Sequence, residues 1–427
     1  MSKPRILIHN GRMIDPGQQI DRITNVLIED GRIASYDAPF NGHDIVIDAT
    51  EKIIAPGLID IHAELREPGC EEDETIATGT RAAIAGGFTS IACVPNTEPP
   101  LDTQASVEFV RHQAERADNC HVFVLACVSK NRAGEELAEI GSLVKAGAIG
   151  FTDADRSLQN SELLRRALEY CQMFDKPILN RPESSELTHD GIMHEGQLSM
   201  ILGLDGMPTE AEDVMTSRDL RLAEATGGRL HLMGISSAES VQLIRRAKAR
   251  GVRVTAEVCL PNLIWTDQQL RSFDANFKIN PPLRDDQCRE TCISGLVDGT
   301  IDVIVSGHVP RASEKKMQEL DQAPFGMIGF ETALSLLVSH LILPGHLDWN
   351  TALAKLTSHP ARILGINKGT LEVGQDADVV IIDPQAKWTV DPMQLQSKSI
   401  NTPLAGCELT GQVTHVIVSG VVKKTPC

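Results

Sequence analysis

Aromatic residues and long apolar segments are scarce in this chain of 427 residues. Only 4% of the residues are aromatic, and no apolar run approaches the about 20 residues that a membrane span requires. The amino-terminal segment MSKPRILIHNGRMID alternates apolar and polar residues as a strand does, and it has no apolar stretch of the kind that signal peptides contain. These absences predict a cytoplasmic protein without a membrane partner.

Positive charge is also in deficit, because 58 acidic residues outnumber 40 Lys and Arg and give a formal net charge of −18. Such a chain is a poor partner for nucleic acid. The ten cysteines are scattered and include no C-x-x-C pair, which favours reduced core thiols over a zinc or disulfide framework. Neither G-x-x-x-x-G-K-[ST] nor G-x-G-x-x-G occurs, so the sequence gives no support for a nucleotide site.

The middle of the chain alternates regularly between strand-like and helix-like segments. Segments with helical spacing, such as NSELLRRALEYCQMF and ETALSLLVSHLI, separate eight apolar runs of strand character. These runs occupy residues 58–62, 89–94, 122–128, 148–152, 177–181, 229–234, 253–258 and 302–307. Eight strand–helix repeats are typical of a (β/α)₈ barrel, so the fold class is predicted to be α/β.

Both ends of the chain differ from this middle part. NVLIEDGRIASY near the amino terminus and VTHVIVSGVVK near the carboxyl terminus have the pattern of short strands, and Asp30-Gly31 is a hairpin signal. Two β-rich ends around an α/β middle predict a small β-sandwich built from both termini. The predicted domains are a sandwich of residues 1–54 and 365–427 and a barrel of residues 55–364.

Several motifs resemble those of the bacterial dihydroorotases of the amidohydrolase superfamily. They are PGLIDIHAELREPG, AGGFTSIACVPNTEPP, HEGQLSMILGLDGMP, KINPPLR and GTLEVGQDADVVIID. The similarity runs through nearly the whole chain, and LREPG, PNT and NPPLR together favour dihydroorotase over hydantoinase or allantoinase. The resemblance implies a barrel of the amidohydrolase type, whose reacting groups lie at the carboxyl ends of the strands.

Active members of that family carry two zinc ions, and the resemblance implies where the ligands would lie here. His62 matches one ligand histidine and Asp153 matches the bridging aspartate. Four positions differ from the family: three histidines and the aspartate that also acts as base are replaced by Glu64, Arg181, Gly234 and Gly307. A catalytic zinc needs about three protein ligands, glycine offers none, and a guanidinium cannot ligate. These changes predict a chain without cofactor, metal or catalytic residue, and hence not an enzyme.

The resemblance also implies a set of remaining contacts around the degenerate metal site. Arg181 is predicted to take over part of the role of the missing cations by pairing with Glu64, Asp153 or both. The residues that match the family's substrate contacts are interpreted as a vestigial binding site. They either bind an anionic small molecule or serve only as packing at the barrel mouth. They are Arg66, Asn96, Asn280 and His308, whereas Arg311 replaces a second histidine of the same motif.

The predicted role follows from relatives that lack catalytic activity. Some bacterial dihydroorotase-like chains form a complex with aspartate transcarbamoylase in pyrimidine biosynthesis, so the resemblance implies a structural or stabilising subunit of such a hetero-oligomer, with self-association. Two alternatives remain open. One is an active cyclic amidohydrolase with a single metal on His62, Glu64 and Asp153, and the other is a small-molecule sensor that uses Arg66 and Asn96 together with Asn280.

Overall fold

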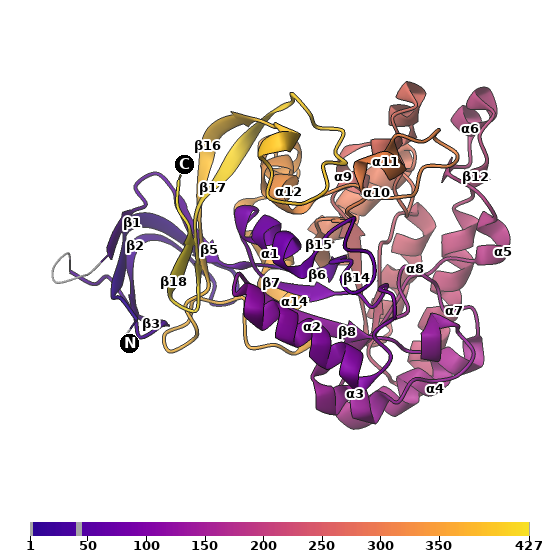
Figure 1. The fold of residues 1–427 in the computed structure, drawn as a ribbon, viewed down its shortest axis with the longest axis horizontal. Coiled ribbons are helices and arrows are strands. Elements are labelled where there is room, and N and C mark those ends of the chain that lie inside the picture. The colour runs from indigo at the N-terminus through magenta and orange to yellow at the C-terminus, as the bar shows by residue number, and fades with distance from the viewer. Residues whose placement is uncertain (1–2, 40–44, 427) are drawn as a thin grey trace.

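A computed structural model describes residues 3–39 and 45–426 of the protein. Two large sheets dominate the fold, and the first and last parts of the chain lie together at one end of the molecule (Figure 1). The remainder of the chain, with its parallel strands and surrounding helices, fills the other end.

The central part of the chain forms a barrel of eight parallel strands. The backbone N–H of Ser306 donates to Asp60 over 2.9 Å and links the end of the last strand to the first, which nearly closes the barrel. All eight predicted strands and the (β/α)₈ fold are confirmed. In sheet order the strands are β6 (Leu58–Ala63), β7 (Phe88–Cys93), β8 (His121–Ala126), β9 (Ala148–Phe151), β10 (Ile178–Asn180), β13 (Leu230–Leu232), β14 (Val254–Cys259) and β15 (Val303–Val305).

Helices cover the outside of the barrel because each has one apolar face. In α4 (Ser161–Cys171), the buried residues include Leu164, Leu168 and Cys171, which share one side of the helix. Side-chain caps fix several helix starts, as Thr75 does for α1 (Ile76–Ala85) by accepting from the N–H of Thr78. The other helices around the barrel are α2 (Gln104–Ala117), α3 (Ile140–Ala146), α7 (Glu210–Thr226), α8 (Ala238–Ala249), α10 (Asp286–Val297), α12 (Phe330–Leu337), α13 (Trp349–Leu356) and α14 (Ser358–Leu364).

The second large sheet is mixed and draws its strands from both termini. Antiparallel pairing of β5 with β16 joins the amino-terminal strands to the carboxyl-terminal ones. The apolar core of this part includes Ile8, Ile28, Ile381 and Ile417, all fully buried. The predicted small sandwich built from both termini is thereby confirmed. Its strands are β1 (Ile6–Asp15), β2 (Ile20–Glu29), β3 (Arg32–Tyr36), β4 (Ile45–Asp48), β5 (Ile53–Pro56), β16 (Val379–Thr389), β17 (Glu408–Val418) and β18 (Val421–Lys424).

Short elements complete the loops at the carboxyl ends of the barrel strands. A two-stranded sheet of β11 (Met193–His194) and β12 (Gly206–Met207) lies near α5 (Ser185–Thr188) and α6 (Gln197–Leu202). The later loops contain α9 (Pro261–Ile264) and α11 (Ser313–Lys316). These loops share a small apolar cluster of their own, which includes Ile279, Leu283 and Met327, and this cluster holds them over the barrel mouth.

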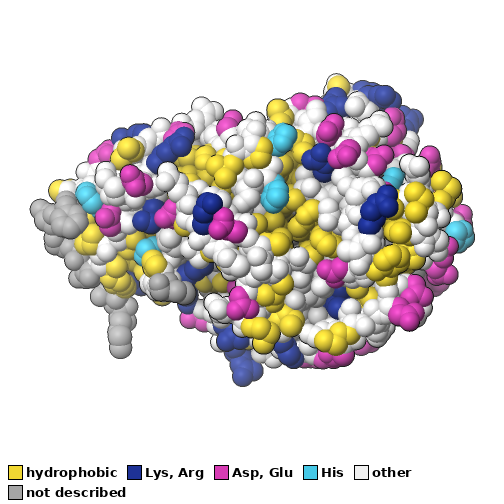
Figure 2. All heavy atoms as spheres, turned by 90° about the horizontal axis from the view of Figure 1, so that it is seen from above, with side chains coloured by type: hydrophobic (Ala, Val, Ile, Leu, Met, Phe, Trp, Pro, Cys, Tyr) yellow, Lys and Arg dark blue, Asp and Glu magenta, His cyan; other side chains and the backbone are white. Residues whose placement is uncertain are grey.

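The thiols are mostly buried, and the surface carries charged side chains of both signs (Figure 2). Within the described part of the chain, no helix is long and apolar enough to cross a membrane. The nine described cysteines are all free, and seven of them are buried, as the prediction of core thiols requires; Cys427 lies outside the described residues. Acidic and basic side chains are interspersed over the face shown in Figure 2.

Candidate active site

A cavity of about 120 Å³ lies at the carboxyl ends of the barrel strands, where this fold places its reacting groups. Its charged and polar lining comes from several strand ends and the loops that follow them. The lining includes His62, Glu64, Asp155, Arg181, Asn262, Asn280 and Arg311, with Pro261, Val309, Phe325 and Met327 among the apolar residues. The cavity therefore combines an imidazole, two carboxylates and two guanidinium groups in a largely apolar enclosure.

His62 is oriented by a buried carboxylate across the barrel. Its Nδ1 lies 2.6 Å from Oε1 of Glu257, whose other oxygen lies 3.1 Å from Nε2 of His231. Burial raises the pKa of Glu257, but the two histidines outweigh it and hold that pKa at about 2, so Glu257 is ionised. Because Nδ1 of His62 faces Glu257, its Nε2 is left for the cavity.

The same contact changes the basicity of the imidazole. Burial by itself lowers the pKa of His62, since a charged ring is poorly solvated there. The charge and hydrogen bond of Glu257, and the charge of Glu64, act in the opposite direction and prevail, so the pKa of His62 is raised above its ordinary value. A histidine backed by a carboxylate in this way has the arrangement of a general base and acid.

Glu64 and Asp153 are held by partners close to them in the sequence or the sheet. Glu64 forms an ion pair with Arg66, and both residues are only 4% exposed. Asp153 accepts hydrogen bonds from the backbone N–H groups of Val128 (2.9 Å) and Ser129 (3.1 Å) and from the Ser129 hydroxyl. Asp153 is turned toward the end of β8 and does not line the cavity.

Arg181 does not make the contacts predicted for it. Its Nη2 lies 2.7 Å from Oε2 of Glu183, which also accepts a hydrogen bond of 3.2 Å from the amide of Asn280. The predicted pairing of Arg181 with Glu64 or Asp153 is therefore wrong. The reason is local, because Glu183 follows Arg181 on the same loop, while the other two carboxylates already have donors of their own.

Gly234 and Gly307 are fitted to their positions by backbone conformation. Their φ angles are +62° and +70°, in the left-handed region that favours glycine. A Cβ atom on Gly234 would lie 3.1 Å from Cδ of Pro281, and one on Gly307 would lie 3.4 Å from Cδ of Pro261. A ligand side chain at either position would thus meet an unfavourable backbone, and at Gly234 it would also crowd the ring of Pro281.

The residues present do not fit the metal site that the family implies. No group of three or more His, Cys, Asp or Glu side chains in residues 3–39 and 45–426 is arranged to hold a metal ion. His62, Glu64 and Asp153, the three candidate ligands of a single metal, are each committed to a different partner. We therefore derive no chemical step through a metal.

The residues that match the family's substrate contacts fall into two groups. Asn280 lines the cavity, and its Oδ1 is buried with no hydrogen-bond partner among the described residues. Arg66, Asn96 and His308 lie outside the lining. The ring of His308 stacks on Phe330 at 4.0 Å between centroids, and its Nδ1 accepts a hydrogen bond of 3.2 Å from the N–H of Gly329.

Unsatisfied polar atoms accompany all four of these residues. Besides Oδ1 of Asn280, Nε of Arg66, both amide atoms of Asn96 and Nε2 of His308 are buried without a hydrogen-bond partner in the described part of the chain. A buried polar group left unpaired costs about 1–3 kcal/mol. Such groups therefore indicate a polar partner from outside the chain, water or a bound molecule.

Three residues of this site were not identified from the sequence. Glu257 orients His62, Asp155 lines the cavity, and Arg132 forms an ion pair with Asp155. The available signal for Glu257 was a single acidic residue inside the apolar strand VTAEVC. For Asp155 it was the second aspartate of FTDAD, which follows Asp153 by two residues.

Comparison with known proteins agrees with the motifs. A sequence profile described as "Dihydro-orotase-like" matches residues 51–240, and one described as "Amidohydrolase family" matches residues 331–423. The chain is 46% identical to a dihydroorotase of Pelotomaculum thermopropionicum and 42% identical to one of Acetivibrio thermocellus, over 98% of this chain and 98% of each relative. The L-hydantoinase (dihydropyrimidinase) of Arthrobacter aurescens has a similar fold, with a TM-score of 0.89 at 23% identity, over 100% of this chain and 96% of that one.

These relatives correct one prediction made from the sequence. The prediction that the chain is not an enzyme is wrong, because relatives that match it over nearly its whole length are named dihydroorotases. The four changed ligand positions bear only on activation of water by a metal. The imidazole–carboxylate pair of His62 and Glu257, which lies beside the cavity, offers another way to activate water.

Proposed function

The chain belongs to the dihydroorotase-like amidohydrolases, and from this premise we propose that it opens and closes a small cyclic amide that carries a carboxylate, as dihydroorotate does. The observation that carries the proposal is the pair of His62 and Glu257 at a cavity that also holds the guanidinium groups of Arg181 and Arg311. The pair supplies proton transfer, and the two cations suit an anionic substrate.

In ring opening, His62 moves one proton between two atoms. Nε2 accepts a proton from a water molecule as the water oxygen forms a bond to the amide carbon of the ring. The tetrahedral intermediate then collapses, the C–N bond breaks, and Nε2 returns the proton to the departing nitrogen. Glu257 stabilises the imidazolium that forms between these steps and keeps the ring in position. Ring closure follows the same steps in reverse.

The guanidinium groups stabilise negative charge in this scheme. A guanidinium has five N–H donors, and the Nη2 of Arg181 bonds Glu183, which leaves other donors for the oxyanion of the intermediate. Arg311 donates from Nε to the carbonyl of Phe325 and lines the same cavity. In this scheme Arg311 binds the carboxylate of the substrate, and the Nδ2 group of Asn280, one N–H of which donates to Glu183, contributes its second N–H.

The test is a steady-state assay of the purified chain with dihydroorotate, with its ring-opened carbamoyl acid, and with dihydrouracil as a matched ring that lacks the carboxylate. We expect kcat/KM for dihydroorotate to exceed that for dihydrouracil by about 10-fold or more, because a charge-assisted contact is lost. Dialysis against EDTA should leave the rate unchanged. Absence of turnover on both rings, or loss of activity in EDTA with recovery in zinc, would contradict the proposal.

A second proposal concerns the partner and rests on the resemblance to chains that associate with aspartate transcarbamoylase. Exposed apolar side chains on α5, α6 and α7 support a protein contact of some kind, since such residues mark interaction surfaces. They are Leu187, Met200, Ile201 and Val214. In this proposal the chain is an active enzyme that forms a hetero-oligomer with the transcarbamoylase, which acts in the same pathway.

Co-expression of this chain with the aspartate transcarbamoylase of the same organism tests that association. A permanent complex buries more than about 2,000 Å², so the two chains should elute together in gel filtration at micromolar concentration. Met200→Lys on the exposed face of α6 should weaken the complex, and Met393→Lys, at another exposed methionine, is the matched control. Separate elution of the two wild-type chains would refute the proposal.

A further inference from the structure

The segment between β16 and β17, residues 390–407, leaves the sandwich sheet and reaches the loops at the barrel mouth. We call this segment the strap. Its two ends are joined, because the N–H of Val390 donates to the carbonyl of Cys407 over 2.9 Å and the N–H of Gly406 donates to the carbonyl of Val390 over 2.8 Å. Between these ends, several residues of the strap take their hydrogen-bond partners from the barrel.

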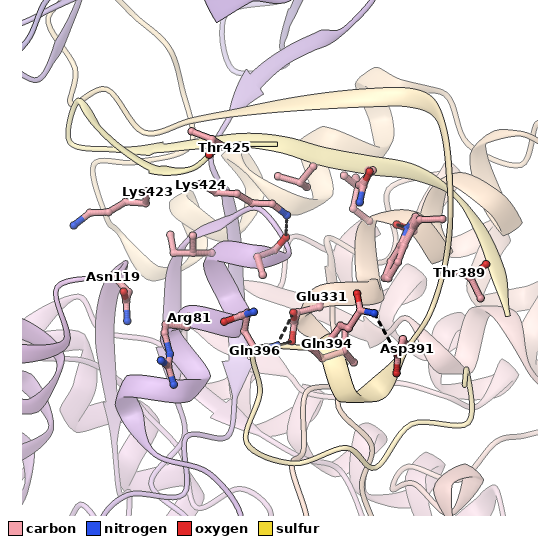
Figure 3. Close-up of a pocket in the computed structure, with 18 residues that line it drawn as sticks. Arg81, Asn119, Glu331, Thr389, Asp391, Gln394, Gln396, Lys423, Lys424 and Thr425 are labelled. Carbon is pink, nitrogen blue, oxygen red and sulfur yellow. Dashed lines mark hydrogen bonds between the residues drawn. The ribbon is translucent and has the colours of Figure 1, made fainter. Parts of the chain in front are cut away.

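Two carboxylates of the barrel hold the first half of the strap. Glu331 of α12 accepts hydrogen bonds from the backbone N–H groups of Gln396, at 2.8 and 2.9 Å, and of Ser397, at 3.1 Å. Figure 3 shows Glu331 and Gln396 bonded beside a cavity of about 440 Å³ between the barrel and the sandwich. Glu74, which precedes α1, accepts from the backbone N–H of Lys398 over 3.1 Å and from the hydroxyl of Ser397. These bonds direct the next residues of the strap toward the barrel mouth.

Asn401 of the strap joins the two arms of one loop at the barrel mouth, residues 309–328, which we call the arginine loop. Its side-chain oxygen accepts from the backbone N–H of Arg311 over 3.1 Å. Its Nδ2 donates to the carbonyls of Val309 and Gly326, each over 3.1 Å. All three partners are backbone groups whose donor or acceptor role is fixed. The side chain at this position must therefore supply one acceptor and two donors, as an asparagine amide does.

The arginine loop supplies five of the residues that line the cavity at the barrel mouth. They are Val309, Arg311, Phe325, Gly326 and Met327. Nε of Arg311 donates to the carbonyl of Phe325 over 2.9 Å, and its Nη1 lies 3.7 Å from Oδ2 of Asp73, which Lys315 already binds at 3.0 Å. Asn401 is 4% exposed and does not line the cavity, so it can affect a substrate only through the loop.

From these contacts we propose that Asn401 is a positioning residue for substrate recognition, which holds the arginine loop so that Arg311 meets the carboxylate of the substrate. The inference rests on the proposed function, and it gives the sandwich part of the chain a role in selecting the substrate. Without the amide, the N–H of Arg311 and the carbonyls of Val309 and Gly326 lose a partner. Substrate binding then weakens in proportion to the fraction of molecules in which Arg311 keeps its position.

Steady-state kinetics of Asn401→Ala on dihydroorotate and dihydrouracil tests the proposal. KM for dihydroorotate should rise about 10-fold because the contact with the carboxylate is weakened, while kcat should stay within about 3-fold of the wild type. The pair of His62 and Glu257 is unchanged in this variant. For dihydrouracil, which has no carboxylate, kcat/KM should stay within about 3-fold of the wild type. A change confined to one ring separates positioning of Arg311 from a general disturbance of the fold.

Gln396→Ala is the matched control. It removes another amide of the strap, which lines the cavity of Figure 3 and not the cavity at the barrel mouth, and it keeps the backbone N–H that Glu331 binds. Its kinetics on both rings should equal those of the wild type.

Asn401→Ser is a milder change for the case in which alanine impairs folding. A serine hydroxyl keeps one hydrogen-bonding group, so KM for dihydroorotate should rise about 3-fold or more. In Arg311→Met, which has already lost the guanidinium, Asn401→Ser should raise KM no further. The proposal is overturned if both Asn401 variants keep the wild-type KM for dihydroorotate, if both rings lose kcat/KM equally, or if the effect of Asn401→Ser persists in full beside Arg311→Met.

Failure of the proposed function has a different signature, because it appears in the wild type as absence of turnover on both rings or as loss of activity in EDTA. Isothermal titration calorimetry with orotate, an unreactive ring with the same carboxylate, then tests the role of Asn401 by binding alone. Wild-type affinity about 3-fold or more above that of Asn401→Ser would still support the positioning role. Equal affinities, or no binding of orotate to the wild type at millimolar concentration, would overturn it.

Discussion

His62→Gln is expected to lower kcat for ring opening by about 10³-fold, within the range that positioned acid–base groups contribute. The glutamine amide can still donate to Glu257, so the cavity keeps its shape. The glutamine amide cannot act as a base, however, so no atom that faces the substrate can accept a proton from water. We expect KM to change little, since the contacts that hold the substrate carboxylate come from Arg311 and Asn280. Steady-state kinetics on dihydroorotate measures both quantities.

Two further variants separate proton transfer from general disturbance. Glu257→Gln keeps a hydrogen bond to His62 but removes the charge that supports the imidazolium, so kcat should fall about 10²-fold or more while KM holds. His112→Gln changes a histidine whose side chain is 75% exposed on α2, and its activity should equal that of the wild type. If His62→Gln retains half of the wild-type kcat, His62 is not the base.

The barrel could be predicted because each of its strands can be recognised from a short stretch of the sequence. Each strand is a short apolar run buried on both faces, and each is separated from the next by a segment with helical spacing. Strands β10, β13 and β15 have only three residues each, yet their apolar runs were long enough in the sequence to identify them. The sandwich was predictable for a related reason, since its strands carry turn signals such as Asp30-Gly31.

The side-chain partners within the site could not be predicted in the same way. His62 and Glu257 are 195 positions apart, and only closure of the barrel between β15 and β6 brings β14 close to β6. Arg181 occupies the position of a family ligand, and for that reason it was predicted to substitute for a metal. The structure instead gives Arg181 the nearer Glu183, and it gives Glu64 the nearer Arg66.

Arg66→Ala is expected to lower the free energy of unfolding by about 3–5 kcal/mol, because it leaves the buried carboxylate of Glu64 without its partner. From the sequence, Arg181 was the predicted partner of Glu64. Urea denaturation followed by circular dichroism measures it, and Arg181→Ala is the matched control. That control should cost less than Arg66→Ala, since the side chain of Glu183 is 25% exposed and keeps the amide of Asn280.

The double variant Glu64→Gln with Arg66→Met gives the decisive comparison. A neutral amide beside an apolar side chain no longer strands a charge, so most of the stability lost in Arg66→Ala should return. A double variant as unstable as Arg66→Ala would mean that the loss comes from packing around the Arg66 side chain. An Arg66→Ala protein as stable as Arg181→Ala would mean that Glu64 reaches water or another donor once Arg66 is removed. Either result would refute the buried ion pair of Arg66 and Glu64 as the main source of stability at the end of β6.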